Sequence, residues 1–192
     1  MHVYLIRHPL PLVEAGICYG HTDLACAPEQ QAATLRDALP LLPPSLAGIP
    51  VISSPLRRCA DLALALPEAE VTFDARLKEM HFGAWEMRRW DAIAREEVDA
   101  WAANLLHYRP GDGENVLQLT RRVHDFYLSL LERDDPQLIV VAHSGSMRVL
   151  AACASDSSVE QIAARLKDTP SPKYGEVVIW QPKKAKTKKI KQ

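Results

Sequence analysis

The chain has 192 residues, of which 47% are hydrophobic and 24% charged, and this length fits one domain with a sizeable buried core. Six of the 23 basic residues are lysines at positions 183–192, so residues 1–182 carry 17 basic and 24 acidic side chains and a formal charge of −7. Such an acidic body argues against nucleic-acid binding through the main domain. The lysine-rich end is expected to be a disordered tail.

The residues show no signal for a membrane or a secreted location. A bilayer-spanning helix needs about 18 or more consecutive apolar residues, and no such run is present. No basic segment followed by an apolar stretch opens the chain, and the four cysteines have no CxxC spacing. We therefore expect a cytoplasmic protein with reduced thiols and no membrane partner.

The first part of the chain alternates between strand and helix signals. Short apolar runs predict strands, and apolar positions at helical spacing, ended by prolines, predict helices. In chain order the predicted elements are a strand at 2–6, a helix at 29–42, a strand at 49–53, a helix at 55–66 and a strand at 71–73. Pro55 is expected in the first turn of its helix.

The second part begins with two longer predicted helices. The elements in order are helices at 88–106 and 114–133, a strand at 138–142, helices at 144–154 and 159–166, and a strand at 176–181. This alternation predicts a single three-layer α/β/α domain over residues 1–182 with a mainly parallel sheet. In such sheets ligands bind beyond the carboxyl ends of the strands.

Histidine and arginine side chains follow three of the predicted strands. Arg7 and His8 follow the first strand, Arg58 comes after the second, and His143 and Ser144 follow the fourth. In a parallel sheet these residues converge on one edge. Guanidinium groups match the oxygens of a phosphoryl group, and a helix that starts at Ser144 adds backbone N–H donors. The pattern therefore predicts a phosphoryl-binding site.

Four motifs at these positions resemble, in order, the motif set of the histidine phosphatase superfamily, which includes the phosphoglycerate mutase-like enzymes. They are LIRH at 5–8, SPLRR at 54–58, LKEMHFGAWE at 77–86 and VVAHSG at 140–145. The segment PGDGEN at 110–115 is similar to the PGGES-type segment of that family. The resemblance covers residues 2–181 and implies a phosphoglycerate mutase-like fold.

The resemblance implies roles for five residues. His8 is similar to the nucleophile that becomes phosphohistidine, and Arg7, Arg58 and His143 are similar to the phosphate pocket. Glu79 is similar to the general acid that protonates the leaving oxygen and then activates water. The residue types fit these roles, because guanidinium groups disfavour the protonated form of a neighbouring imidazole. The scheme requires no metal and no cofactor, and no HxH or HExxH spacing is present.

The segment GICYGHTD at 16–23 resembles the α-ribazole phosphatase branch, whose members remove phosphate from a precursor of the cobalamin lower ligand. This second resemblance implies a small phosphorylated metabolite as substrate, with α-ribazole 5′-phosphate as a candidate, and a place in cobalamin biosynthesis. Tyr19 and Trp85 are expected either to wall the substrate pocket or to pack in the interior.

Departures from the family pattern leave alternatives open. Pro9 stands where the family usually has glycine and lacks a backbone N–H, HSG replaces HGG at 143–145, and Asn115 replaces a common serine. The predicted function is a metal-independent phosphomonoesterase. The alternatives are a phosphoglycerate mutase, which calls for more cationic cover than this chain offers, and an inactive phosphate-binding scaffold that has lost turnover through Pro9. The leaving group and the oligomeric state stay open.

Overall fold

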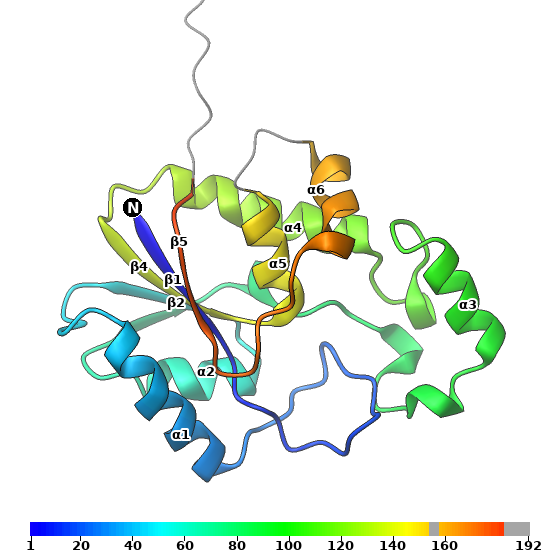
Figure 1. The fold of residues 1–192 in the computed structure, drawn as a ribbon, viewed down its shortest axis with the longest axis horizontal. Helices are drawn as coiled ribbons and strands as arrows, with labels where there is room; N and C mark the ends of the chain where they lie inside the picture. The colour runs from blue at the N-terminus through cyan, green and yellow to red at the C-terminus, as the bar shows by residue number, and fades with distance from the viewer. Residues whose placement is uncertain (154–157, 183–192) are drawn as a thin grey trace, which may run out of the picture.

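The computed structural model describes residues 1–153 and 158–182 and is built on one five-stranded sheet (Figure 1). In chain order the strands are β1 (His2–Arg7), β2 (Pro50–Ser53), β3 (Glu70–Phe73), β4 (Gln137–Ala142) and β5 (Val177–Trp180). Their spatial order is β3-β2-β4-β1-β5, with β5 antiparallel to β1 and the other pairs parallel. The predicted α/β fold with a mainly parallel sheet is confirmed.

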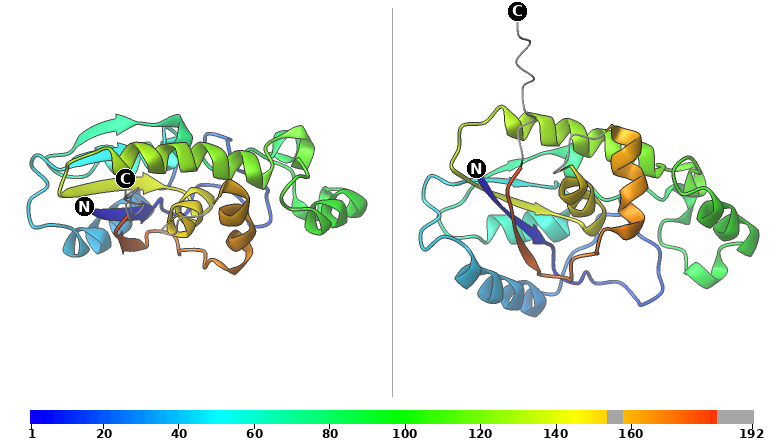
Figure 2. Two further views of the ribbon diagram at one scale, coloured as in Figure 1. Left: turned by 90° about the horizontal axis from the view of Figure 1, so that it is seen from above. Right: turned by 45° about the horizontal axis from the view of Figure 1, so that its top comes forward.

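Helices cover both faces of this sheet (Figure 2). One face is covered by α1 (Pro28–Ala38) and α2 (Arg57–Leu64), and the other by α4 (Val116–Leu131), α5 (Ser144–Ala152) and α6 (Val159–Arg165). Successive side chains of a strand point to opposite faces. Val3 and Leu5 of β1 accordingly pack in the cluster with α4 and α5, whereas Ile6 packs with α2. The three layers match the sequence prediction.

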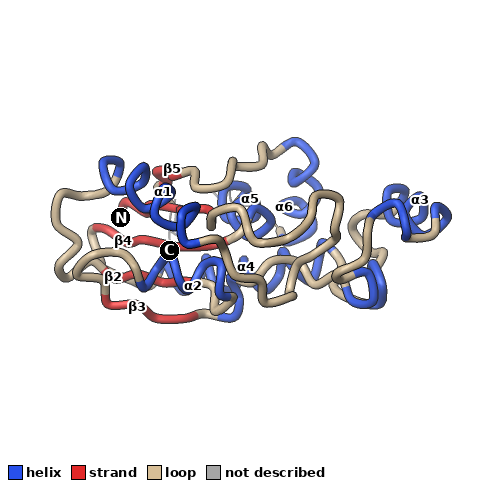
Figure 3. The backbone as a smooth tube through the Cα atoms, turned by 90° about the horizontal axis from the view of Figure 1, so that it is seen from below, coloured by secondary structure: helices blue, strands red, loops and turns tan. Residues whose placement is uncertain are grey.

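Residues 82–113 form a lobe beyond the carboxyl ends of the strands, which we call the α3 lobe after its helix α3 (Arg95–Ala103) (Figure 3). Its two ends cross at Gly83 and Gly111, which have φ values of 55° and 54°. A Cβ on Gly83 would lie 1.9 Å from the Gly111 carbonyl oxygen, so this crossing requires glycine. The crossing ties the lobe to the domain at its base.

Three predicted helices begin later than expected, and one of them is α4, which starts at Val116 instead of residue 114. The helix predicted at 88–106 is α3, which starts at Arg95, because Trp90 occupies a 3-10 turn and stacks on Trp101 with ring centroids 5.8 Å apart. Aromatic packing therefore outweighs helix propensity in this segment. Pro55 lies before α2 and outside its first turn, since Leu56 is extended and the helix starts at Arg57.

The tail predicted at 183–192 lies outside the described residues, as does the last residue of the helix predicted at 144–154. Within the described ranges, no helix combines the length and hydropathy needed to cross a bilayer.

Candidate active site

The ends of β1, β2 and β4 bring the predicted residues together. His8 follows β1, Arg58 lies in the first turn of α2 after β2, and His143 follows β4. All three are buried, with exposed fractions of 2% for His8 and 0% for the other two. The rings of His8 and His143 lie 4.9 Å apart between centroids. The fold therefore concentrates titratable groups at the edge where parallel sheets bind ligands.

One hydrogen bond fixes the protonation pattern of His8. Its Nδ1 lies 2.6 Å from the carbonyl oxygen of Pro9. A carbonyl oxygen only accepts, so Nδ1 carries the proton and Nε2 keeps its lone pair. In the described part of the chain, His8 forms its hydrogen bond through Nδ1 alone, and the residue lines a cavity of about 640 Å³. Pro9 thus lacks a backbone N–H but still orients the imidazole through its carbonyl group.

The surroundings keep both imidazoles neutral. Burial, together with the positive charges of Arg58 and Arg7, lowers the pKa of His8 from 6.5 to about 3, although the hydrogen bond to Pro9 acts in the opposite direction. Complete burial, with His8 and Arg58 nearby, also holds the pKa of His143 well below its usual value. At neutral pH the lone pair on His8 Nε2 is therefore available.

Two arginines form the cationic part of the site. Arg58 donates from Nη1 to the Thr22 carbonyl oxygen at 2.8 Å and from Nη2 to the Gly20 carbonyl oxygen at 2.5 Å. Arg7 donates from Nη1 to the Pro172 carbonyl oxygen at 2.5 Å. The Nε atoms of both arginines are buried and have no partner among the described residues. Buried charges without a counter-ion are costly, so the pair favours an anion in the cavity.

His143 is held from the β2 side of the site. Its Nε2 lies 2.8 Å from the Ser54 hydroxyl and 3.4 Å from the Cys59 thiol sulfur. Its backbone N–H donates to the Ser146 hydroxyl, and α5 begins at Ser144 directly after it. Ser144 itself lines the cavity.

Glu79 is held by the start of α5. One carboxylate oxygen accepts from the backbone N–H of Gly145 at 3.0 Å, and the other accepts from that of Met80 at 2.9 Å. The N-terminus of a helix favours a carboxylate through its free N–H groups and its dipole. The Gly145 N–H donates to Glu79, so this N–H at the start of α5 stabilises the Glu79 side chain. It is therefore not one of the backbone donors that were expected to bind the phosphate.

Arg122 of α4 fixes the segment that carries Glu79, and the sequence analysis missed it. Its guanidinium group donates to the carbonyl oxygens of Arg76, Lys78 and Glu79 at 2.7 to 2.8 Å. It also forms a two-pronged ion pair with Glu114, with N–O distances of 2.7 and 2.8 Å. The helical pattern of residues 114–133 gave no hint of this contact, because an arginine on a helix face is ordinarily solvated.

Tyr174 is a second residue that sequence reasoning missed. Its ring lies 3.9 Å below the guanidinium carbon of Arg7, and its hydroxyl is 2.7 Å from that of Tyr19. Burial and this hydrogen bond raise the pKa of Tyr19, which keeps the phenol protonated. The two rings flank the arginines, since Tyr19 also lies 5.5 Å from the guanidinium carbon of Arg58. Tyr174 lies in no motif that would single it out.

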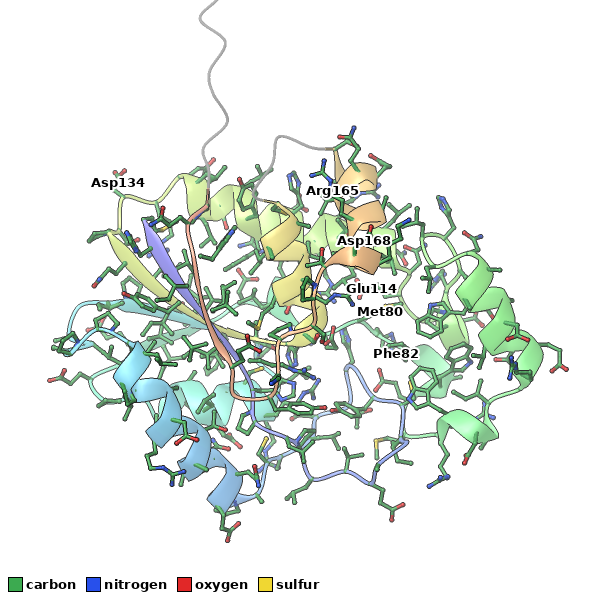
Figure 4. All side chains as sticks on the ribbon, viewed as in Figure 1. Met80, Phe82, Glu114, Asp134, Arg165 and Asp168 are labelled. Atoms are coloured by element: carbon green, nitrogen blue, oxygen red, sulfur yellow. The ribbon has the colours of Figure 1, made fainter. Side chains whose placement is uncertain are left out.

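A cavity of about 640 Å³ joins these groups to an apolar arm. Its polar end is lined by Arg7, His8, Tyr19, Arg58, Glu79 and Ser144. The remaining wall includes the apolar residues of an arm toward the α3 lobe, namely Met80, Phe82, Trp101, Leu105, Leu106, Val116 and Leu119. Gly145, Ala163, Ala164, Leu166 and the cationic Arg148 and Lys167 line the rest of the cavity. Figure 4 shows Met80 and Phe82 between the sheet and the α3 lobe. The cavity can hold a phosphoryl group at one end and an apolar or aromatic body at the other.

The structure separates the two predicted aromatic walls. Tyr19 lines the cavity. Trp85 is fully buried inside the α3 lobe, where its indole N–H donates to Glu97 at 2.7 Å, so interior packing is the one of its two expected places that the structure shows. Trp101, which packs edge-on against Trp85, lines the arm instead. Tryptophans at 85, 90 and 101 are equally apolar in sequence, and only the packing of the lobe decides which one faces the cavity.

The fold and the site together define an α/β protein in which a neutral histidine, a candidate nucleophile, lies beside two arginines. The family profile described as the histidine phosphatase superfamily (branch 1) matches residues 3–171. The chain is 32% identical over 162 residues to an adenosylcobalamin/alpha-ribazole phosphatase of Escherichia coli K12, covering 79% of this chain and 78% of that protein. The chain belongs to the histidine phosphatase superfamily and is a phosphatase.

Two further relatives show the breadth of this family. The chain is 33% identical over 142 residues to a protein of Salmonella arizonae named probable phosphoglycerate mutase GpmB, covering 69% of this chain and 64% of that protein. The crystal structure of the alpha-ribazole phosphatase from Shigella flexneri superposes with a TM-score of 0.78 at 24% identity, over 93% of this chain and 89% of that one. The latter likeness supports the phosphoglycerate mutase-like fold.

Proposed function

We propose that the protein is a metal-independent phosphomonoesterase in which His8 is the nucleophile. The observation that carries the proposal is the hydrogen bond from His8 Nδ1 to the Pro9 carbonyl oxygen, because it leaves the lone pair on Nε2 free in the cavity. A neutral imidazole beside Arg7 and Arg58 combines a nucleophile with a cationic floor that balances phosphoryl charge.

The reaction has two steps with balanced proton transfers. Nε2 of His8 attacks phosphorus in line, the ester P–O bond breaks, and Glu79 gives its proton to the leaving oxygen. A water molecule then attacks the phosphohistidine, its proton passes to Glu79, and the P–N bond breaks to release inorganic phosphate. Arg7 and Arg58 hold the equatorial oxygens throughout, because arginine keeps its charge at every stage, and we take the neutral His143 as a further phosphate contact.

The substrate that fits this cavity is a small phosphorylated metabolite with an aromatic or apolar body. The rings of Phe82 and Trp101 and several leucine side chains line the arm. α-Ribazole 5′-phosphate carries such a body, and a relative with that printed activity covers most of the chain. We therefore take it as the first candidate substrate, with a role in cobalamin biosynthesis.

A mutase is the second candidate, since one relative is named as a probable phosphoglycerate mutase. A glycerate body would leave the apolar arm unfilled, which favours the phosphatase. Incubation with 3-phosphoglycerate and 2,3-bisphosphoglycerate distinguishes the two: a mutase yields 2-phosphoglycerate, whereas a phosphatase yields inorganic phosphate.

The test uses p-nitrophenyl phosphate, with wild-type protein and the His8→Ala variant. We expect turnover by the wild type that EDTA leaves unchanged, no turnover by the variant, and an acid-labile phosphoenzyme after rapid quenching of the wild type alone. Turnover by His8→Ala would refute the mechanism. Phosphate binding without any phosphoenzyme would favour the inactive scaffold.

A further inference from the structure

The carboxylate of Glu86 accepts hydrogen bonds from a loop on the far side of the site. The backbone N–H groups of Gly20, His21 and Thr22 donate to it at 2.9 to 3.0 Å, and the Thr22 hydroxyl donates at 2.5 Å. The Phe82 N–H donates as well, at 3.0 Å. Three consecutive N–H groups that converge on one anion form a backbone nest. Here the anion is a side chain of the protein itself.

The opposite side of the same loop binds Arg58. The carbonyl oxygens of Gly20 and Thr22 accept from its two Nη atoms. The Gly20 carbonyl and the His21 N–H belong to one peptide group, which therefore bridges Glu86 and Arg58 directly. Each end of that peptide dipole faces the charge that stabilises it.

The loop that binds Arg58 also packs against the segment that carries Glu79. A Cβ on Gly20 would lie 1.8 Å from the Met80 carbonyl oxygen, so the loop backbone is packed directly against the segment that carries Glu79. Arg58 is fully buried and has no carboxylate partner within salt-bridge distance among the described residues. Its guanidinium orientation consequently depends on the two loop carbonyls.

We propose that Glu86 is a positioning residue that acts through residues 20–22 to aim the Arg58 guanidinium at the phosphoryl group. The proposal rests on the proposed function, because it takes Arg58 as a phosphate ligand. Burial opposes ionisation of Glu86, but the Thr22 hydroxyl and the N–H groups of Phe82, Gly20 and His21 lower its pKa to about 2. The carboxylate is thus charged at every pH at which the enzyme would work.

The test replaces the carboxylate by an amide of the same shape. In Glu86→Gln the –NH2 group faces N–H donors and satisfies none of them, so we expect the Kd for inorganic phosphate to rise roughly tenfold and kcat/KM for p-nitrophenyl phosphate to fall about 10- to 100-fold. Glu97→Gln is the matched control. Glu97 lies in the same lobe and accepts from the buried Trp85 ring, yet touches neither residues 20–22 nor Arg58. It should leave both values unchanged.

A double-mutant cycle separates positioning from general support of the fold. If Glu86 acts through Arg58, Glu86→Gln has little further effect on phosphate affinity in an Arg58→Ala background. The same fold-loss in both backgrounds would overturn the proposal, as would wild-type values in a folded Glu86→Gln protein. If Glu86→Gln does not fold, Thr22→Val takes its place, because it removes one of the five hydrogen bonds to Glu86. A smaller loss of phosphate affinity that disappears in the Arg58→Ala background supports the proposal. A loss of affinity that is unchanged in that background overturns it.

Phosphate affinity tests the positioning role of Glu86, and turnover tests the proposed function, so the two proposals can fail independently. Wild-type protein that binds phosphate without hydrolysing esters would refute the proposed function, and the cycle would still be read from the Kd. If Arg58→Ala binds phosphate as tightly as the wild type, the positioning role is overturned, because Arg58 is then not a phosphate ligand.

Discussion

Gly145 is the position where one added methyl group tests the role of Glu79. A Cβ at Gly145 would lie 2.1 Å from a carboxylate oxygen of Glu79, whereas nonbonded heavy atoms settle near about 3.5 Å. In Gly145→Ala the carboxylate must therefore move by more than about 1 Å and lose its hydrogen bond to the Gly145 N–H. A displacement of this size in a reacting group costs about 100-fold in rate, or about 2.7 kcal/mol in the activation barrier.

The assay compares leaving groups. A displaced general acid harms an alkyl phosphate, whose leaving oxygen needs a proton, more than p-nitrophenyl phosphate, whose leaving group departs as an anion. We expect kcat for glycerol 2-phosphate to fall about 100-fold in Gly145→Ala, a smaller fall for p-nitrophenyl phosphate, and an unchanged Kd for inorganic phosphate.

Glu79→Gln is the matched variant for this experiment and should show the same dependence on the leaving group. Adding Gly145→Ala to it should then change little, since both substitutions remove one function. Equal losses on both esters, or wild-type kcat for Gly145→Ala, would show that Glu79 is not the proton donor held by α5.

Two further predictions concern acid stability and substrate choice. Because burial and the arginines lower the pKa of His8 from 6.5 to about 3, the folded protein binds fewer protons than the unfolded chain between these values, and stability falls as pH drops below 6.5. This group alone lowers the free energy of unfolding by about 2 kcal/mol between pH 7 and pH 5. Urea unfolding should therefore show a loss of stability over this pH range that is smaller by that amount in His8→Asn than in the wild type. An identical loss in both proteins would contradict the lowered pKa of His8. Trp101→Leu should lower kcat/KM about 2- to 10-fold for esters with an aromatic body relative to glycerol 2-phosphate, and an equal effect on both would exclude ring contact in the arm.

The strand ends were predictable because the rule behind them is topological. Parallel strands bring their carboxyl ends to one edge, so Arg7, His8 and His143 had to meet whatever the details of packing. Arg58 met them because α2 begins directly after β2. Only the order of the elements and the alternation of apolar runs were needed.

The surroundings of these residues were not predictable in the same way. Arg122 and Tyr174 reach the site from segments whose sequence pattern is that of a helix face and a surface loop. The sequence could not show that Trp101 lines the cavity while Trp85 packs in the interior, because the α3 lobe is a small aromatic core and burial there depends on ring packing that periodicity does not encode. Trp90 likewise lies outside the helix in which it was predicted, because it stacks on Trp101.

The crossing of Gly83 and Gly111 has a consequence for how the substrate specificity of this protein could be changed. The groups that handle phosphorus stand on strand ends, while Trp101 and the neighbouring leucines that receive the rest of the substrate lie in a lobe fastened at that crossing. Insertions or exchanges within residues 87–110, which spare Glu86 and both glycines, are therefore expected to alter which ester is hydrolysed and to leave the reaction centre unchanged. A library confined to that interval, with both glycines kept, is the economical route to new specificities on an unchanged reaction centre.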